Sequence, residues 1–220
     1  MYIPIGILLV ETYLKVKESE GYIANMIQGG SNRQKILACA QHLFFEKGYD
    51  AVGVQEIVNT AGITKPTMYY YFKSKQGLLE CLLQEGGERL LQRIGDITEQ
   101  DGDFEDMLYQ VTEVYVWCAV GDMEFYLMLI SVFSSAKDNE AFHLAKPYIS
   151  RLIQLMTAFF EKYAEEVPEM KGKEEYLAIS YTGVINMYML VYFERGELQS
   201  EKVLRTLVKE TCAFFKKALT

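Results

Sequence analysis

The stretch at residues 64–75 carries the side chains whose types and spacing most clearly suggest a chemistry. Its sequence is TKPTMYYYFKSK, in which three consecutive tyrosines lie between lysines. In a short helix, Met68 and Phe72 would lie on one face and could anchor in a core. The opposite face would present Lys65, Thr67 and the tyrosines, whose ammonium and hydroxyl groups suit phosphate oxygens and base edges. The stretch predicts a helix that reads DNA, although a tyrosine-rich face can also be a packing surface.

Two shorter helices are expected before this stretch. Residues 54–61 have apolar side chains at helical spacing and end at Gly62, a turn residue that can take a positive φ. Upstream, Ser31 and Gln34 have the spacing of a capping box, which would open a helix that ends at Gly48. The apolar positions of that first helix are Ile36, Leu37, Ala40, Leu43 and Phe44. Three such helices can bury one small core and leave the third free to lie in a major groove.

In this region the sequence resembles the tetracycline-repressor (TetR) family of bacterial transcriptional regulators. The residues that carry the resemblance are Leu43-Phe44, Gly48-Tyr49, Ile57, Ala61-Gly62-Ile63, Thr67 to Phe72, Ser74-Lys75 and Leu78-Leu79. The resemblance implies an all-α protein with a three-helix, helix-turn-helix DNA-binding domain at residues 31–91 and the motif itself at about 54–73. It implies a C-terminal helical domain at residues 92–220 for effector binding and dimerisation.

The resemblance also implies a set of DNA-binding residues. They are Gly53, Gln55, Thr64, Lys65, Thr67, Tyr69, Tyr70, Tyr71 and Lys75. Among them, Lys65, Thr67 and Tyr70 are the implied base-edge readers, whereas Lys75 and the other two tyrosines are implied contacts to the DNA backbone. Gly53 stands where relatives usually have Ser or Thr, and glycine is still accepted at a helix N-cap.

The net charge of the chain is −8, which is unusual for a protein that binds nucleic acid. The charge is unevenly distributed, because residues 31–75 contain six basic and three acidic side chains and so carry +3. The remainder carries −8 minus +3, or −11. We therefore expect the basic segment to attract the phosphates and the acidic remainder to face away from DNA.

The sequence offers little support for an enzyme or a metalloprotein. It contains no paired histidine and carboxylate, no phosphate-cradling glycine loop and no Cys–His cluster, so no catalytic residue, metal or cofactor is expected. The scattered cysteines Cys39, Cys81, Cys118 and Cys212 favour free thiols in a reducing cytoplasm. No apolar run is long enough for a bilayer. A helical adaptor without DNA function is the competing class, but it does not account for residues 65–75.

Residues 1–30 form an N-terminal extension to the expected domain. Residues 3–10 are an apolar run that is too short to span a membrane and has no signal-peptide cleavage pattern. Two interpretations remain open. Met26 can be the natural start, with residues 1–25 non-native, or residues 8–17 can form a helix that docks on the body or on a partner.

Further helices are expected after Ser74. A long helix follows Ser74 and contains Gly86-Gly87, which favours either close helix packing or a compliant point that transmits ligand-driven motion. The remaining helices are expected at 104–120, 122–136, from 139 or 147 to 166, 173–195 and 200–219.

By the resemblance, the last two helices, at about 173–195 and 200–219, form the homodimer interface. An effector cavity is implied among the central helices, with candidate residues Tyr109, Glu113, Trp117, Phe125, Met128, Phe159 and Tyr188. Glu113, Asp122 and Glu124 would favour a cationic ligand if buried, and are otherwise surface charges. The implied function is a cytoplasmic regulator, most simply a repressor that binds a near-palindromic double-stranded operator as a dimer and is released by a small apolar or aromatic effector. An activator or a ligand-independent binder of the same fold remains open.

Overall fold

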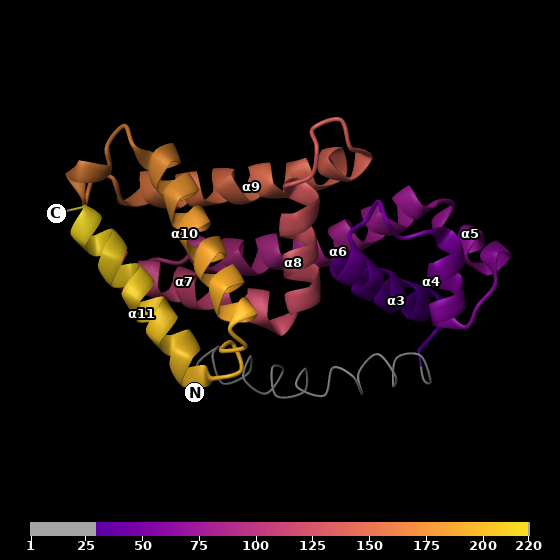
Figure 1. Ribbon diagram of the computed structural model, residues 1–220. Helices are drawn as coiled ribbons and strands as arrows, with labels where there is room; N and C mark the ends of the chain where they lie inside the picture. Colours follow the sequence, from indigo (N-terminus) through magenta and orange to yellow (C-terminus); the bar gives the residue numbers. More distant parts are fainter. Residues whose placement is uncertain (1–29, 220) are drawn as a thin grey trace. The chain divides into compact units, whose positions relative to one another are not determined.

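The computed structural model describes residues 30–219, which form helices and connecting turns and contain no strand. The elements are α3 (Asn32–Lys47), α4 (Val54–Ala61), α5 (Lys65–Phe72), α6 (Lys75–Thr98), α7 (Phe104–Gly121), α8 (Met123–Phe133), α9 (Glu140–Tyr163), the short 3-10 helix η1 (Pro168–Met170), α10 (Glu174–Glu194) and α11 (Glu201–Ala218) (Figure 1). The predicted all-α architecture is confirmed. The predicted extension, with its alternatives of a start at Met26 or a helix over residues 8–17, lies outside the described residues except for Gly30.

Local sequence signals set the ends of the first three helices. The Ser31 hydroxyl accepts a hydrogen bond from the Gln34 amide, and Gln34 Oε1 accepts one from the Ser31 amide, which completes the predicted capping box. Gly62 closes α4 at a φ of 64°, a left-handed conformation that glycine adopts without a steric penalty. The Thr64 hydroxyl accepts from the Thr67 amide and opens α5.

The apolar faces of these three helices meet in one small core. Helix α3 packs against both α4 and α5. The buried side chains include Ile36, Leu37, Ala40, Leu43 and Phe44 of α3, Ile57, Val58 and Ala61 of α4, and Met68 and Phe72 of α5. Each set repeats every three to four residues, which is the spacing that places side chains on one face of a helix.

Helix α9 begins at Glu140 and runs through Pro147 without ending there. The earlier of the two predicted starts is therefore right to within one residue. The Asn139 side chain accepts a hydrogen bond from the Ala141 amide at 2.8 Å, which gives the helix its start. Pro147 removes one backbone donor inside the helix, a loss that the surrounding turns of α9 tolerate. Helix α8 ends at Phe133, three residues before the predicted end at Ala136.

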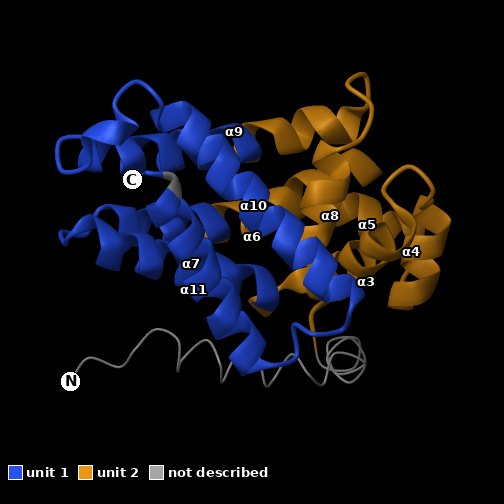
Figure 2. Cartoon of the chain, turned by 60° about the vertical axis from the view of Figure 1, so that its left-hand side comes forward, with its two compact units in different colours: residues 1–10, 90–120, 149–220 blue, residues 11–89, 121–148 orange. Residues whose placement is uncertain are grey.

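The described chain divides into two compact units (Figure 2). Unit 2 contains residues 30–89 and 121–148, and unit 1 contains residues 90–120 and 149–219. Helices α6 and α9 each pass from one unit to the other. The predicted division after residue 91 lies close to the point where α6 changes unit. Unit 2 also takes in α8, because α3 packs along it, whereas the sequence assigned α8 to the C-terminal domain.

Candidate DNA-binding site

Helix α5 presents a tyrosine-rich surface. Met68 and Phe72 are buried and fix one face of this helix to the core of the three-helix module. The side chains of Tyr69, Tyr70 and Tyr71 are exposed, and that of Tyr70 is 74% exposed. The predicted anchor residues are therefore buried and the predicted DNA-facing tyrosines exposed, with Tyr70 the most exposed of them. A contiguous set of phenol groups at the surface can reach phosphate oxygens and base edges.

The N-terminus of α5 adds positive potential to this surface. Lys65 is exposed, and it occupies the first turn together with Pro66, which lacks an amide hydrogen. The Oγ1 atoms of Thr64 and Thr67 lie 2.9 Å apart, so the two hydroxyls share a hydrogen bond at the helix start. Free amides and the helix dipole favour an anion at such an end, and Lys65 strengthens that preference.

The start of α4 lies at the surface as well. Gly53 is exposed and caps α4 in an extended conformation without a side-chain hydrogen bond. Gln55 is also exposed, and its Nε2 donates to Asn59 Oδ1 at 2.8 Å within the same helix. Both predicted residues are accessible to a ligand, but Gly53 offers only its backbone to a phosphate.

Lys75 is placed differently from the other predicted DNA-binding residues. Its side chain is half-buried, and its Nζ donates to the backbone oxygens of Tyr49 at 3.0 Å and Val52 at 3.1 Å. The ammonium group also lies 4.0 Å from the centroid of the Tyr49 ring. Its donors are thus directed toward the protein's own loop.

The turn from α5 to α6 is unusually tight. Lys73 has a φ of 65° and a ψ of −38°, and the Ser74 amide donates to the Phe72 oxygen at 2.7 Å. A positive φ at a residue other than glycine costs about 1–3 kcal/mol, which the surrounding structure must offset. The Ser74 hydroxyl then accepts from the Gly77 amide at 2.9 Å and caps α6. This turn therefore fixes the tyrosine-rich helix α5 to the start of the long helix α6.

Sequence reasoning missed Arg33. Its guanidinium lies 5.7 Å from the centroid of the Phe72 ring and forms an ion pair with Glu85 of α6. The hydrogen bond that Arg33 donates to the Glu85 carboxylate raises the pKa of Arg33. Arg33 therefore connects α3, α5 and α6 from one position. The available signal was its placement four residues before the buried Leu37, which puts both on one face of α3.

The seven predicted effector-binding residues are distributed over both units. Phe125 and Met128 belong to unit 2, and the other five belong to unit 1. Trp117 and Phe159 are fully buried, whereas the Tyr188 side chain is partly exposed. Tyr109 is half-buried, and Glu113 lies 3.6 Å from the guanidinium of Arg205 on α11. The effector site stays a prediction.

The two other carboxylates considered as ligand-binding groups have protein partners. Asp122 accepts hydrogen bonds from Gln41 Nε2 and from Arg89, each at 2.8 Å. Glu124 Oε1 lies 3.0 Å from Nδ1 of His42, so the chain does contain a paired histidine and carboxylate, which the sequence did not predict because the two residues are 82 positions apart. All five residues belong to unit 2, so these contacts tie α3 and α6 to the start of α8.

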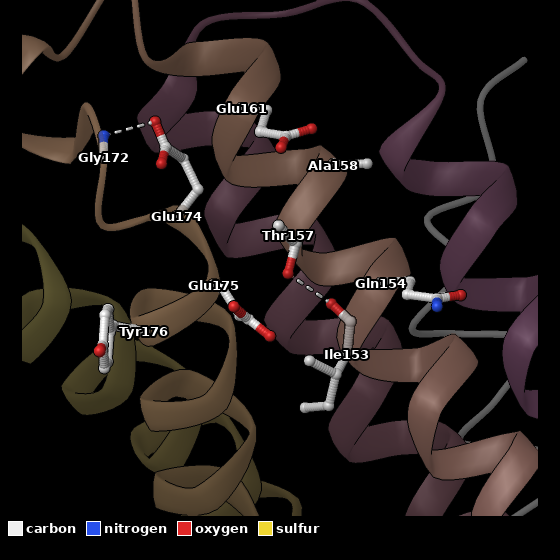
Figure 3. Close-up of a pocket in the computed structure, with 9 residues that line it drawn as sticks. All are labelled: Ile153, Gln154, Thr157, Ala158, Glu161, Gly172, Glu174, Glu175 and Tyr176. Carbon is white, nitrogen blue, oxygen red and sulfur yellow. Dashed lines mark hydrogen bonds between the residues drawn. The ribbon is translucent and has the colours of Figure 1, made fainter.

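A groove of about 510 Å³ runs between α9 and the start of α10 (Figure 3). Its lining residues are Ile153, Gln154, Thr157, Ala158, Glu161, Gly172, Glu174, Glu175 and Tyr176. The Glu175 carboxylate lies between the two helices near Thr157, and Glu174 accepts a hydrogen bond from the Gly172 amide (Figure 3). None of the seven predicted effector residues lines this groove.

Comparison with known proteins identifies the module formed by the first helices. Residues 36–82 match the family model described as bacterial regulatory proteins, tetR family. These residues include most of α3, all of α4 and α5 and the first part of α6. They therefore contain every predicted DNA-binding residue.

Relatives extend the similarity along the chain. The uncharacterized HTH-type transcriptional regulator YvkB of Bacillus subtilis is 25% identical over 191 residues, which cover 85% of this chain and 96% of the relative. The HTH-type transcriptional repressor BdcR of Escherichia coli is 35% identical over 80 residues, 36% of this chain and 40% of the relative. The solved structure of the regulator FadR from Bacillus subtilis, in complex with stearoyl-CoA, has a TM-score of 0.67 at 17% identity and covers 81% of this chain and 94% of its own. The helix-turn-helix module, the all-α fold and the relatives agree, and residues 36–82 of this chain form a helix-turn-helix domain of the TetR family of transcriptional regulators.

Proposed function

We propose that the protein binds a near-palindromic operator as a homodimer and acts as a repressor that a small, apolar or aromatic effector releases from DNA. The observation that carries the DNA-binding part is the surface of α5, where three tyrosines and Lys65 are exposed while Met68 and Phe72 are buried. Tyrosine hydroxyls and a lysine at a helix N-terminus suit phosphates and base edges. The proposed base-edge readers are Lys65, Thr67 and Tyr70.

The distribution of charge supports this assignment. Residues 31–75 carry six basic and three acidic side chains, whereas the whole chain has a net charge of −8. Lys47 forms an ion pair with Glu56, and Arg33 forms one with Glu85. These two basic side chains therefore attract phosphates less strongly than unpaired ones would. Lys65 has no ion pair within the described residues and lies on the proposed recognition helix. Its phosphate attraction would be sensitive to salt.

The surface of α10 supports a homodimer. Tyr176, Ile179 and Met187 are exposed on one side of this helix, and Tyr176 is 76% exposed. Gly183 lies between them in sequence, and a Cβ added at residue 183 would have no atom within 4 Å. A contiguous apolar face with a glycine at its centre suits a second helix at close approach. The exposed Phe214 of α11 provides further apolar surface.

A membrane is the second candidate for covering this face. Contrary to the expectation from the sequence, helix α10 is long and apolar enough to cross a bilayer by length and composition, and 28% of its most apolar 18-residue segment is buried. Its other side, however, carries the Tyr181 hydroxyl, which lies 2.7 Å from Thr112 Oγ1 of α7. This buried polar contact fixes α10 within unit 1, so a second copy in the cytoplasm is the favoured partner.

The effector part of the proposal rests on the fold. The similar FadR structure is a complex with stearoyl-CoA, which gives one precedent for a small molecule bound by a protein of this fold. The candidate residues here are Tyr109, Glu113, Trp117, Phe125, Met128, Phe159 and Tyr188. An effector that prefers a conformation with a different spacing of the recognition helices would weaken DNA binding by its differential affinity, typically about 1–3 kcal/mol. The relative BdcR is a repressor, which favours repression over activation for this protein as well.

The test is selection of duplexes from a random-sequence pool by the purified protein, followed by anisotropy titrations from about 50 to 200 mM salt. The proposal expects enrichment of a near-palindrome with half-sites about 34 Å apart and a steep loss of affinity with salt. A scrambled duplex of the same composition is the control. Absence of enrichment together with absence of binding at low salt would contradict the proposal and favour a helical adaptor.

A further inference from the structure

The loop between α3 and α4 is held from the side of α6 by Lys75. The ammonium group of Lys75 donates to the backbone oxygens of Tyr49 and Val52 at 3.0 and 3.1 Å. Its nitrogen also lies 4.0 Å from the centroid of the Tyr49 ring, within the range of a cation–π interaction. Tyr49 is buried and packs against Phe44 with ring centroids 5.1 Å apart. Lys75 thus has carbonyl and aromatic partners on the loop.

The position of Lys75 in α6 is consistent with this role. Lys75 is the first residue of the helix, where the helix dipole disfavours a cation. The two carbonyl oxygens and the aromatic face provide the negative potential that offsets this disadvantage. The side chain is half-buried, so its charge is also partly removed from water. Both features fit an ammonium group that bridges backbone carbonyls.

The same loop is held from the side of α9. The Tyr49 hydroxyl donates to the Glu140 carboxylate, and Asn139 Nδ2 donates to Asp50. Burial, and next the hydrogen bond to Glu140, raises the pKa of Tyr49, so its hydroxyl stays protonated as a donor. All of these residues belong to unit 2. The loop is therefore connected to the first residues of both α6 and α9.

The loop leads directly into the helix-turn-helix. Val52 precedes Gly53, whose backbone oxygen accepts the first hydrogen bonds of α4 from Glu56 and Ile57. A shift of the Val52 carbonyl would therefore move the start of α4 and with it the exposed Gln55. Because α4 also packs on α5, such a shift would reach the recognition helix.

We propose that Lys75 and Tyr49 are positioning residues for DNA binding, in which the Lys75 ammonium clamps the loop before α4 instead of binding a phosphate. This inference rests on the proposed function and differs from the backbone contact that the family resemblance implies for Lys75. The clamp fixes the start of α4, and through α4 it fixes the orientation of α5.

The salt dependence of DNA affinity separates the two roles. A side chain that neutralises one phosphate contributes about 0.9 to the slope of log affinity against log salt. Lys75→Met should lower affinity for the selected duplex by about tenfold and leave this slope unchanged. The matched control is Lys65→Met, which should lower the slope. A slope reduced equally by both variants would overturn the proposal.

Two further variants test the clamp itself. Lys75→Gln removes the charge but keeps two N–H donors, so it should recover part of the affinity lost in Lys75→Met at the same slope. Tyr49→Leu should lower affinity, and the double variant Tyr49→Leu/Lys75→Met should lose less than the product of the two single losses. Losses that multiply, or a Gln variant no better than Met, would overturn the proposal. Far-UV circular dichroism confirms that each variant is folded.

Amide hydrogen exchange provides a readout that does not need DNA. In Lys75→Met, exchange at residues 53–57 should increase, whereas exchange in α11 should match the wild type. Unchanged exchange at residues 53–57 would overturn the clamp. If the wild-type protein selects no duplex, the proposed function fails, and the exchange result alone still decides whether Lys75 holds the loop.

Discussion

Gly86 of α6 lies directly against the aromatic ring of Phe125 of α8, because a Cβ at position 86 would be 2.4 Å from Cε2 of that ring. The neighbouring Gly87 has the same relationship to Tyr148, with 2.5 Å to Cδ1. Of the two interpretations of this glycine pair, close helix packing is the one that these contacts support. The pair lets two aromatic rings approach the backbone of α6 within unit 2.

Gly86→Ala should therefore destabilise the protein although alanine favours helix. The gain in helix propensity is about 1 kcal/mol, whereas overpacking a core typically costs about 1–3 kcal/mol. We expect a net loss of unfolding free energy of up to about 2 kcal/mol in urea titrations. Gly95→Ala is the matched control in the same helix, because its Cβ would lie 3.5 Å from Leu155, an ordinary contact. A Gly86→Ala variant as stable as Gly95→Ala would contradict the packing argument.

Asp122 gives a prediction about pH. Burial raises the pKa of its carboxyl, while Arg89, the Phe125 amide and Gln41 act in the opposite direction. Because the folded-state pKa exceeds the ordinary value of 3.8, the stability that this group contributes is complete below that value. It is lost as the pH rises through the folded-state pKa.

Asp122→Asn removes this titration and keeps a residue that caps helices well. The unfolding free energy of the variant relative to wild type should therefore increase as the pH rises from the ordinary pKa of Asp122 toward neutrality. Urea titrations of both proteins at several pH values measure this difference. Asp122→Ala is the control for the cap, and it should be less stable than the Asn variant at every pH, by about 0.5–2 kcal/mol. A difference between Asn and wild type that does not change with pH would contradict the assignment.

The parts of the fold that the sequence predicts well are those with local causes. The capping box at Ser31, the left-handed Gly62 and the spacing of Met68 and Phe72 are set by residues a few positions apart. The roles of Lys75 and Asp122 depend on partners distant in sequence, since Lys75 binds carbonyls more than 20 residues earlier and Asp122 binds Gln41, 81 residues away. Composition and periodicity carry no information about such pairings.

The predicted effector site likewise could not be derived from sequence patterns. A wall of aromatic and methionine side chains is indistinguishable in sequence from an ordinary core. Trp117, Met128 and Phe159 are fully buried, and Phe159 packs against Phe160 with ring centroids 5.4 Å apart. Which of these side chains can move apart to admit a guest depends on packing between helices, which the spacing of residues in the chain does not determine.

Tyr70 tests the recognition surface directly. Because its side chain is 74% exposed, Tyr70→Ala should change the unfolding free energy by no more than about 0.5 kcal/mol. Affinity for the selected duplex should fall by about 1–3 kcal/mol, with a smaller loss for scrambled DNA. Tyr70→Phe separates the hydroxyl from the ring, since the phenyl group can still pack against Tyr71. If Tyr70→Ala retains full affinity and sequence preference, α5 is not the helix that reads the groove.

Met187 tests the homodimer. Its side chain is 60% exposed at the apolar face of α10 that we propose as the subunit interface. Met187→Glu would bury a charge from each protomer in the proposed twofold interface, and like charges brought together there cost several kcal/mol when they are desolvated. We expect sedimentation equilibrium to show a dimer for the wild type and a monomer for the variant at micromolar concentration.

The loss of the dimer should also weaken DNA binding. Two linked recognition helices bind neighbouring half-sites with a high effective concentration, and a monomer loses that advantage without any change at α5. Met187→Glu should therefore bind a single half-site with the affinity of the wild type but lose affinity for the full selected duplex. Gln92→Glu, at an exposed position of α6, adds the same charge as a control and should leave both the dimer and the DNA affinity intact. A Met187→Glu protein that remains dimeric would place the subunit interface elsewhere.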